Sequence, residues 1–259
     1  MQKAEIKNIL THALNPKRGR VMLKKLRKRF WDETGLISNE ENLAWLQAHC
    51  SSFETLARGI DPSLWEESER FRERLANHAN EKLRGIEYAL GGGGSAYFLY
   101  FLTRYTKPNC IVETGVAAGY TSYAFLAAIE ENGRGKLHSS DLPYYRLPDP
   151  ERYIGVLVED SMKEHWELYI DGDEANLPRI CDQVDEIDIF HYDSDKSYSG
   201  RRFAMSCVAP KMKRDGVIVM DDLHDNPFFH DYVTAYETAA WRVVDYKGKY
   251  VGIVGEVVR

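Results

Sequence analysis

The sequence is poor in the features that mark secreted, membrane and nucleic-acid-binding proteins. It has four cysteines in 259 residues and no Cys-x-x-Cys pair, so we expect reduced thiols rather than a disulfide framework or a metal set. The longest apolar run, Ala96–Leu102, is too short to cross a bilayer, and the N-terminus has the pattern of an amphipathic helix rather than a signal peptide. The formal net charge of −6 argues against a nucleic-acid ligand. These absences predict an ordinary globular protein of the cytoplasm.

One further absence narrows the ligand. Residues 111–122 run from a β-branched pair through an acid and two glycines into a helical pattern. This predicts a strand, a tight turn and a helix N-terminus of the kind that holds nucleotide-like ligands. Gly115 and Gly119 are four residues apart, and the Gly-x-Gly-x-x-Gly pattern of dinucleotide-binding proteins is missing. Because Asp141 follows the next predicted strand, we favour a ligand site over a plain helix–strand turn.

Residues 1–90 are predicted to be helical. Lys17–Arg29 holds eight Lys or Arg in thirteen positions. This run is compatible with a patch for a phosphorylated substrate or an anionic membrane surface, but we favour a solvated helix face balanced by the acidic remainder of the chain. Asp61-Pro62 predicts the start of a long helix, whose apolar stripe continues to Leu90 and which Gly91–Gly94 ends.

From residue 91 onward, buried apolar runs alternate with amphipathic helical patterns, which predicts a mostly parallel sheet. We expect seven strands, at residues 110–113, 137–140, 166–170, 187–192, 217–220, 241–246 and 250–257. The last two flank Lys247-Gly248-Lys249, which predicts a hairpin. The expected fold is α/β, a Rossmann-like, seven-stranded, mostly parallel sheet with a C-terminal antiparallel hairpin. We expect a helical N-terminal region over 1–90 and the sheet domain over 91–259.

Three aspartates follow two of the predicted strands: Asp193 the fourth, and Asp221 and Asp222 the fifth. The carboxyl ends of parallel strands open at one edge of a sheet, so these side chains should lie near the glycine loop. Two unit charges about 4 Å apart repel by roughly 4 kcal/mol at an effective dielectric of 20. The cluster should therefore share a proton, turn one acid outward, or bind a cation, with Mg²⁺ preferred over Ca²⁺ or Mn²⁺. Without a metal, Asp222 would cap a helix and Asp221 would orient a loop.

Five short motifs stand in a fixed order along the second half of the chain: Val112–Ser122, Gly135–Pro143, Gly172-Asp173, Ile187–Tyr198 and Gly216–Asn226. In this order they resemble the motifs of class I S-adenosylmethionine-dependent methyltransferases, closest to a bacterial O-methyltransferase-like group (methyltransferase family 24-like). The terminal hairpin also suits the seven-stranded sheet of these enzymes. The resemblance does not cover the N-terminal 90 residues.

The resemblance implies a cofactor site formed by the glycine loop, the helix after it and the ends of the following strands: Glu113, Gly115, Gly119, Ser122, Asp141, Asp173 and Asp193. Gly115 and Gly119 would let the backbone approach the methionine part of S-adenosylmethionine, with Glu113 near its amino group. Asp141 would accept hydrogen bonds from both ribose hydroxyls. Asp173 would hold the adenine, although a helix N-cap is an equally good interpretation of this residue.

Metal-dependent relatives place ligands at the same two strand ends, which supports a metal set and a catalytic set: Asp193, Asp221 and Asp222 for the metal, and His224, Lys196 and Asp193 for catalysis. A metal there would lower the pKa of the acceptor hydroxyl and align its oxygen with the methyl group. The base is left open between Lys196 and His224, because the family pattern often has His at the position of Lys196. Tyr198 and Asn226 match the pattern and would line the acceptor pocket, whereas His191 should be buried and hydrogen-bonded.

The sequence therefore predicts an S-adenosylmethionine-dependent O-methyltransferase, assisted by a divalent metal, for a small hydroxylated acceptor such as a sugar or a secondary metabolite. The helices of residues 1–90 would cover the acceptor or build a homodimer. Two alternatives stay open. One is a nicotinamide-dependent oxidoreductase, against which the glycine loop and the terminal hairpin argue. The other is a non-catalytic module in which the cofactor pocket has a structural or regulatory purpose.

Overall fold

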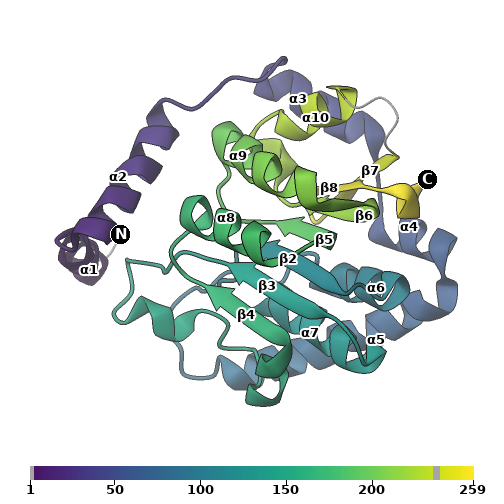
Figure 1. The fold of residues 1–259 in the computed structure, drawn as a ribbon, viewed down its shortest axis with the longest axis horizontal. Helices are drawn as coiled ribbons and strands as arrows, with labels where there is room; N and C mark the ends of the chain where they lie inside the picture. The colour runs from purple at the N-terminus through teal and green to yellow at the C-terminus, as the bar shows by residue number, and fades with distance from the viewer. Residues whose placement is uncertain (1–2, 236–239) are drawn as a thin grey trace.

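The computed structural model describes residues 3–235 and 240–259. These residues form an eight-stranded sheet between two layers of helices (Figure 1). The strands are β1 (Cys50–Ser51), β2 (Cys110–Thr114), β3 (Lys136–Ser140), β4 (Trp166–Tyr169), β5 (Ile187–Tyr192), β6 (Met212–Met220), β7 (Trp241–Tyr246) and β8 (Lys249–Val254). Their order across the sheet is β1-β7-β8-β6-β5-β2-β3-β4.

The sheet is parallel except at β8, which runs antiparallel to both β6 and β7. The predicted α/β fold with a mostly parallel sheet and a C-terminal hairpin is thus confirmed. The prediction of seven strands omitted β1, in which Cys50 lies opposite Val243 and Ser51 opposite Val244. A strand of two residues is too short to show the period-two pattern by which strands are recognised.

The helices are α1 (Lys3–Ala13), α2 (Pro16–Phe30), α3 (Asn39–His49), α4 (Phe53–Ile60), α5 (Pro62–Lys82), α6 (Ala96–Thr106), α7 (Tyr120–Asn132), α8 (Asp173–Gln183), α9 (Tyr198–Val208) and α10 (Phe228–Ala235). Alternate strand residues face opposite helical layers. In β2, Ile111 packs into the core formed with α4 to α7, and Val112 packs into the core formed with α3, α8, α9 and α10. Both faces of the sheet are therefore covered.

The long helix predicted to start at Asp61-Pro62 is present as α5, and Asp61 Oδ1 accepts a hydrogen bond from Leu64 N at 2.9 Å. It ends at Lys82, however, and not at Gly91–Gly94. Gly85 adopts a φ of +83°, a left-handed conformation that helix interiors do not contain. The apolar residues after this turn therefore continue the helical pattern without continuing the helix.

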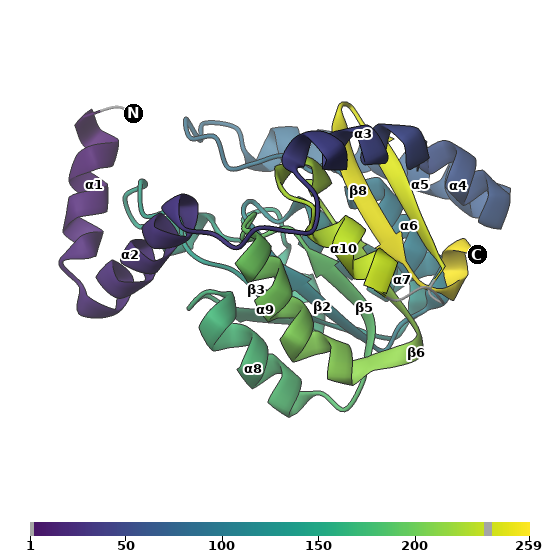
Figure 2. The ribbon, with the colours of Figure 1, turned by 90° about the horizontal axis from the view of Figure 1, so that it is seen from above.

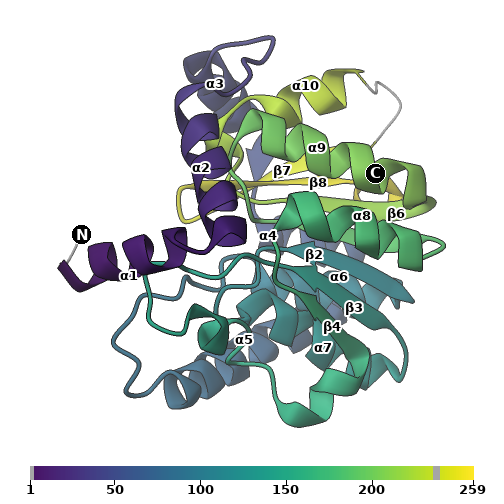
Figure 3. The same ribbon diagram turned by 60° about the vertical axis from the view of Figure 1, so that its left-hand side comes forward.

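The N-terminal region divides into two parts that differ in packing. Phe53 in α4, and Trp65 and Phe71 in α5, are buried in the same core as α6 and α7, and β1 joins the sheet. In contrast, α1 and α2 form an arm that projects from the body beside the carboxyl edge of the sheet (Figures 2 and 3). The change in packing thus lies before α3 and not near residue 90. None of the helices in the described residues has both the length and the apolar composition needed to span a membrane.

Candidate cofactor and acceptor site

A cavity of about 990 Å³ opens at the carboxyl edge, where the loops after β2, β3, β5 and β6 meet. Its volume lies at the upper end of the range for small-molecule sites. Six of the predicted site residues line it: Gly115, Asp141, Asp173, Asp193, Lys196 and Asp222. The lining does not include five others: Glu113, Gly119, Ser122, Asp221 and His224.

The two glycines of the loop allow close packing against neighbouring loops. Both have positive φ, +84° at Gly115 and +94° at Gly119. A Cβ at Gly115 would lie 2.1 Å from the carbonyl oxygen of Asp193, and one at Gly119 would lie 2.9 Å from Cα of Gly155. Gly119 thus serves the fit between two loops of this chain. Gly115 also borders the cavity, and the predicted approach of the two glycines to the methionine group stays a prediction.

Glu113 lies beneath the glycine loop, fully buried. Its carboxylate accepts hydrogen bonds from Thr121 Oγ1 at 2.5 Å, Ser122 Oγ at 2.6 Å and Ser139 Oγ at 2.8 Å. These bonds fix the first turn of α7 against β2 and β3. The geometry does not favour the predicted contacts of Glu113 and Ser122 with the cofactor.

Asp141 is the acid that best fits a ribose. Its Oδ2 accepts a hydrogen bond from Ala117 N at 2.9 Å, and its Oδ1 accepts one from Leu142 N at 2.7 Å. Burial nonetheless raises the pKa of Asp141 to about 6, against the lowering effect of the two backbone bonds. Each carboxylate oxygen can accept a second hydrogen bond, so the side chain can still take a pair of hydroxyl donors.

Asp173 lies at the start of α8 on the cavity wall. Its carboxylate accepts hydrogen bonds from Ser140 Oγ at 2.6 Å and from Ser194 Oγ, and burial raises its pKa. The N-cap of α8 is Gly172, so Asp173 does not have the capping role considered for it. Its place beside Asp141 is compatible with the predicted adenine contact.

The three predicted acceptor-side carboxylates lie together. Asp193, Asp221 and Asp222 line a small cavity of about 40 Å³, and Gly92, Asp193, Asp222 and Lys249 border both this cavity and the main one. Burial and the neighbouring Asp221 raise the pKa of Asp193 to about 7. Parallel strand ends thus bring these acids to one place, as the sequence pattern predicted.

Each of the other two acids has partners of its own. Asp222, whose side chain is 5% exposed, binds Lys196 Nζ through Oδ2, and its Oδ1 lies 3.1 Å from Lys249 Nζ. Asp221 accepts hydrogen bonds from Ser95 Oγ at 3.2 and 3.3 Å. Among the described residues, no group of three or more His, Cys, Asp or Glu side chains is arranged to hold a metal ion. Because Asp222 uses both oxygens on lysines, the donor set does not fit the predicted divalent cation.

His191 lies between Glu113, under the glycine loop, and Asp221 of the acidic cluster. The ring is fully buried, with Nδ1 3.9 Å from Glu113 Oε1 and Nε2 3.7 Å from Asp221 Oδ1. Burial alone would lower the pKa of His191, but the two carboxylates raise it to about 10. The two carboxylates thus favour the protonated form of the ring. As predicted it is buried, but its nitrogens have no hydrogen-bond partner in the described residues, only these longer charge contacts.

The other predicted catalytic and acceptor residues lie outside the cavities. His224 is 37% exposed and 3.6 Å from Asp225 Oδ1, and it lines neither cavity. Tyr198 donates its hydroxyl to Asp231 at 3.0 Å, and Asn226 Nδ2 donates to the carbonyl of Lys196 at 2.9 Å. Of the two candidate bases, only Lys196 reaches the cavity, and Asn226 holds the loop that carries it.

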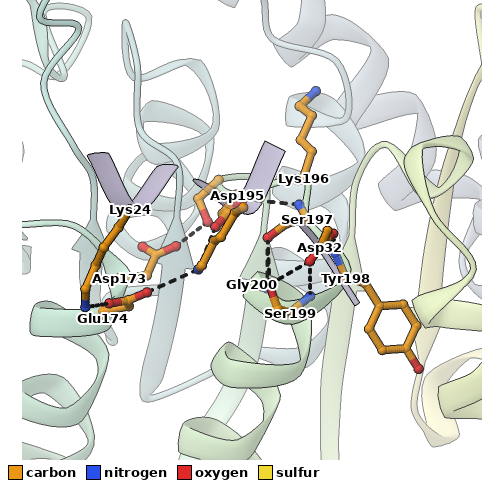
Figure 4. A network of polar contacts seen from close by, with 12 residues as sticks. Lys24, Asp32, Asp173, Glu174, Asp195, Lys196, Ser197, Tyr198, Ser199 and Gly200 are labelled. Atoms are coloured by element: carbon orange, nitrogen blue, oxygen red, sulfur yellow. Dashed lines mark hydrogen bonds and ion pairs between the residues drawn. The ribbon is translucent and has the colours of Figure 1, made fainter. Parts of the chain in front are cut away.

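The arm covers part of the cavity, which is compatible with the acceptor cover considered for residues 1–90. Val21 and Met22 of α2 line it. Lys28 Nζ lies 3.2 Å from Glu174 Oε1 and 3.0 Å from Asp195 Oδ2, and Lys24 reaches the same glutamate (Figure 4). Lys24 and Lys28 thus pair with acids at the cavity rim, so the exposed basic run is balanced by acidic residues of the body and part of it lies against the cavity. The signal was present as a dense basic run in an acidic chain.

Comparison with known proteins agrees with this geometry. Residues 112–223 match the family model described as "Methyltransferase domain". No curated protein has a sequence that matches the chain. The matched range runs from β2 to the residue after Asp222 and contains Asp141, Asp173 and the acidic cluster.

Solved structures share the fold at low sequence identity. The O-methyltransferase TomG from Streptomyces achromogenes, involved in tomaymycin synthesis and solved with S-adenosylmethionine, is 16% identical with a TM-score of 0.55, over 70% of this chain and 88% of that one. A methyltransferase from Geobacter sulfurreducens is 14% identical with a TM-score of 0.52, over 70% and 88%. An O-methyltransferase from Bacillus cereus, in complex with SAH, is 15% identical with a TM-score of 0.50, over 82% and 100%.

The sheet order, the antiparallel β8 and the family match all disfavour a nicotinamide-dependent oxidoreductase. Residues 112–223 thus match a methyltransferase domain, and the chain shares the α/β fold of solved methyltransferases.

Proposed function

We propose that this protein is an O-methyltransferase that transfers the methyl group of S-adenosylmethionine to a hydroxyl of a small acceptor. The observation that carries the proposal is the position of Asp141 in a cavity that continues past Gly115 to Asp193. The side near Asp141 and Asp173 fits the nucleoside part of the cofactor, and the side near Asp193 leaves room for an acceptor. The O-methyltransferases of the same fold support a hydroxyl as the methyl-accepting group.

Bound S-adenosylmethionine supplies an electrophilic methyl group on a positively charged sulfur. The acceptor oxygen forms a C–O bond as the C–S bond breaks, which yields a methyl ether, S-adenosylhomocysteine and a proton released to solvent. The work of the chain is to hold the two reactants in line, an effect that can supply about 7–11 kcal/mol of the barrier. Gly115 and Asp141 position the cofactor, and the residues around Asp193 position the acceptor. Helix α2, which lines the cavity, restricts the access of water.

The acceptor proposed here is a sugar or a secondary metabolite. The predicted assistance by Mg²⁺ stays a prediction, and no step is derived through a metal because Asp222 is held by two lysines. Removal of divalent ions with EDTA tests it, since a metal-dependent enzyme would lose turnover. A cytoplasmic location likewise remains a prediction.

The arm supports the predicted homodimer. Large apolar side chains that are more than half exposed gather on α1, on α2 and on the segments that follow each helix: Leu10, Leu14, Leu23, Leu26, Phe30, Trp31 and Leu36. The cations Lys24 and Lys28 of α2 face the cavity rim, and its leucines face solvent. Monomers rarely expose apolar patches larger than a few hundred Å². Sedimentation of the wild type against L23S/L26S tests this proposal, which predicts a dimer that the variant weakens.

Calorimetric titration with S-adenosylmethionine tests the function. We expect one site per chain, and no binding at millimolar cofactor would refute the proposal. Methyl transfer from radiolabelled cofactor to a panel of hydroxylated acceptors then tests the reaction. Cofactor binding without transfer to any acceptor of the panel would favour the non-catalytic module, and binding of NADH instead would favour the oxidoreductase.

A further inference from the structure

The acidic cluster at the carboxyl edge contains its own cations. Asp222 is nearly buried, and its two oxygens bind Lys196 and Lys249 separately. Lys196 lies in the loop between β5 and α9, and Lys249 is the first residue of β8. Two segments more than fifty residues apart thus bring an ammonium group to one carboxylate.

Both ammonium groups have donors left for a ligand. The side chains of Lys196 and Lys249 are 49% and 60% exposed, and both line the main cavity beside Asp193. A lysine ammonium carries three N–H donors, and the contact with Asp222 occupies no more than one of them on each lysine. Since the carboxylate fixes where the ammonium groups lie, their remaining donors are positioned at the acceptor end of the cavity.

The charges of the cluster argue against a dication in the same place. Mg²⁺ binds through carboxylate oxygens, which have to be available to the ion in an octahedral arrangement. Here Lys196 and Lys249 offset two of the three carboxylate charges, and Asp221 also faces His191. A metal that used Asp222 would have to displace Lys196 and Lys249, and it would bring two positive charges to a cluster whose carboxylates already face these lysines and His191.

We propose that Lys196 and Lys249, held by Asp222, bind the acceptor hydroxyl oxygen and occupy the role that a divalent metal has in metal-dependent O-methyltransferases. Their N–H donors orient the oxygen and stabilise the negative charge that develops on it while its proton leaves to solvent and the C–O bond forms. This inference rests on the proposed methyl transfer, but it concerns the acceptor side only. Lys249 has no counterpart among the residues that the sequence motifs indicated.

The test uses Mn²⁺ alone and needs no acceptor. Metal-stripped wild-type protein and the double variant K196M/K249M are titrated with Mn²⁺, and the free ion is followed by electron paramagnetic resonance. The variant keeps the three carboxylates and loses both cations. We expect no stoichiometric binding to the wild type at millimolar Mn²⁺, and one bound ion in the variant with an affinity at least about tenfold higher, equivalent to 1.4 kcal/mol.

Lys247→Met is the matched control. Lys247 is in the same hairpin, where its ammonium lies 5.4 Å from the Tyr246 ring centre, and it makes no ion pair with Asp222. The substitution K247M removes one positive charge without changing a residue of the cluster, so this variant should bind Mn²⁺ no better than the wild type. If the double variant does not fold, K249M replaces it, with a smaller gain expected because Lys196 remains.

Two outcomes overturn the proposal. One is a wild-type protein that binds one Mn²⁺ at micromolar concentration and loses it on D222N. The other is a folded double variant that binds S-adenosylmethionine like the wild type and still does not bind Mn²⁺. Titration with S-adenosylmethionine distinguishes failure of this proposal from failure of the proposed function. If the wild type does not bind S-adenosylmethionine, the proposed function is refuted. If the wild type binds both S-adenosylmethionine and Mn²⁺, only the assignment of the lysines is refuted.

Discussion

The carboxylates at the two ends of the cavity have different kinds of partners. At the cofactor end, Asp141 and Asp173 receive hydrogen bonds from backbone amides and serine hydroxyls, and burial raises the pKa of both. At the acceptor end, Asp222 is neutralised by Lys196 and Lys249. A carboxylate that accepts hydrogen bonds from neutral donors can still accept more from the hydroxyls of a ligand. A carboxylate paired with lysines instead holds the ammonium groups in place. The first arrangement therefore binds through the acid, and the second binds through the cations that the acid holds.

The largest effect is expected at His191, which joins the two ends. H191L would leave the buried Glu113 and the partly buried Asp221 without their shared cation, and breaking a buried ion pair typically costs about 3–5 kcal/mol. Urea unfolding monitored by circular dichroism measures the loss. H138L is the control, because His138 is also buried beside a carboxylate but burial lowers its pKa, so its removal deletes no charge. Equal losses of stability in H191L and H138L would contradict a positively charged His191 between Glu113 and Asp221.

Asp141→Asn should act on the cofactor end alone. Loss of a charged acceptor of two hydrogen bonds is expected to weaken S-adenosylmethionine by about tenfold to a hundredfold, since a hydrogen bond to a charged group contributes about 1.5–3 kcal/mol. Isothermal titration gives the affinity. Asp171→Asn is the matched control, because Asp171 lines the same cavity but is two-thirds exposed and paired with Arg179. A D141N protein with wild-type affinity would remove Asp141 from the cofactor site.

The same carboxyl predicts a pH dependence. In the folded, cofactor-free protein the pKa of Asp141 is about 6, above the ordinary 3.8, so the folded protein binds this proton more tightly than the unfolded chain. The contribution of Asp141 to the free energy of unfolding is therefore lost as the pH rises from about 4 to 6. Cofactor hydroxyls need the ionised form. Affinity should therefore fall by up to about tenfold per pH unit below pH 6. D141N should abolish this slope between pH 5 and 7, and a slope that persists in the variant would assign it to another group.

The sequence predicted the cofactor end better than the acceptor end. A strand, a glycine turn and an acid after the next strand are local signals, and the carboxyl ends of parallel strands must meet, so Asp141 and Asp193 could be placed at one edge. Lys249 could not, because its approach to Asp222 depends on β8 entering the sheet between β6 and β7. Glu113 was placed near the cofactor although three hydroxyl groups hold it inside. Gly119 packs closely against Gly155, a contact that depends on how two loops lie together and that the sequence does not show.

The smallest effect is expected at the arm. K28M removes the contacts with Glu174 and Asp195, and partly exposed ion pairs contribute about 0–1 kcal/mol each, so global stability should hardly change. The arm should instead detach more often, which limited proteolysis detects as faster cleavage between α2 and α3. High salt should have the same effect on the wild type. R27M is the control, because Arg27 is exposed on the same helix and makes no ion pair within the described residues. Equal cleavage of K28M and R27M would mean that these contacts do not hold the arm.

Eight residues, 31–38, connect α2 to α3, and α3 is packed into the core. A tether this short keeps the detached helix near its docking site at an effective concentration of about millimolar. Loops of about ten residues close within roughly 10–100 ns. Contacts too weak to hold two separate molecules together are thus sufficient to keep the helix in place most of the time. The cavity can admit and release small molecules through brief openings of the arm, while the sheet and both of its cores stay folded.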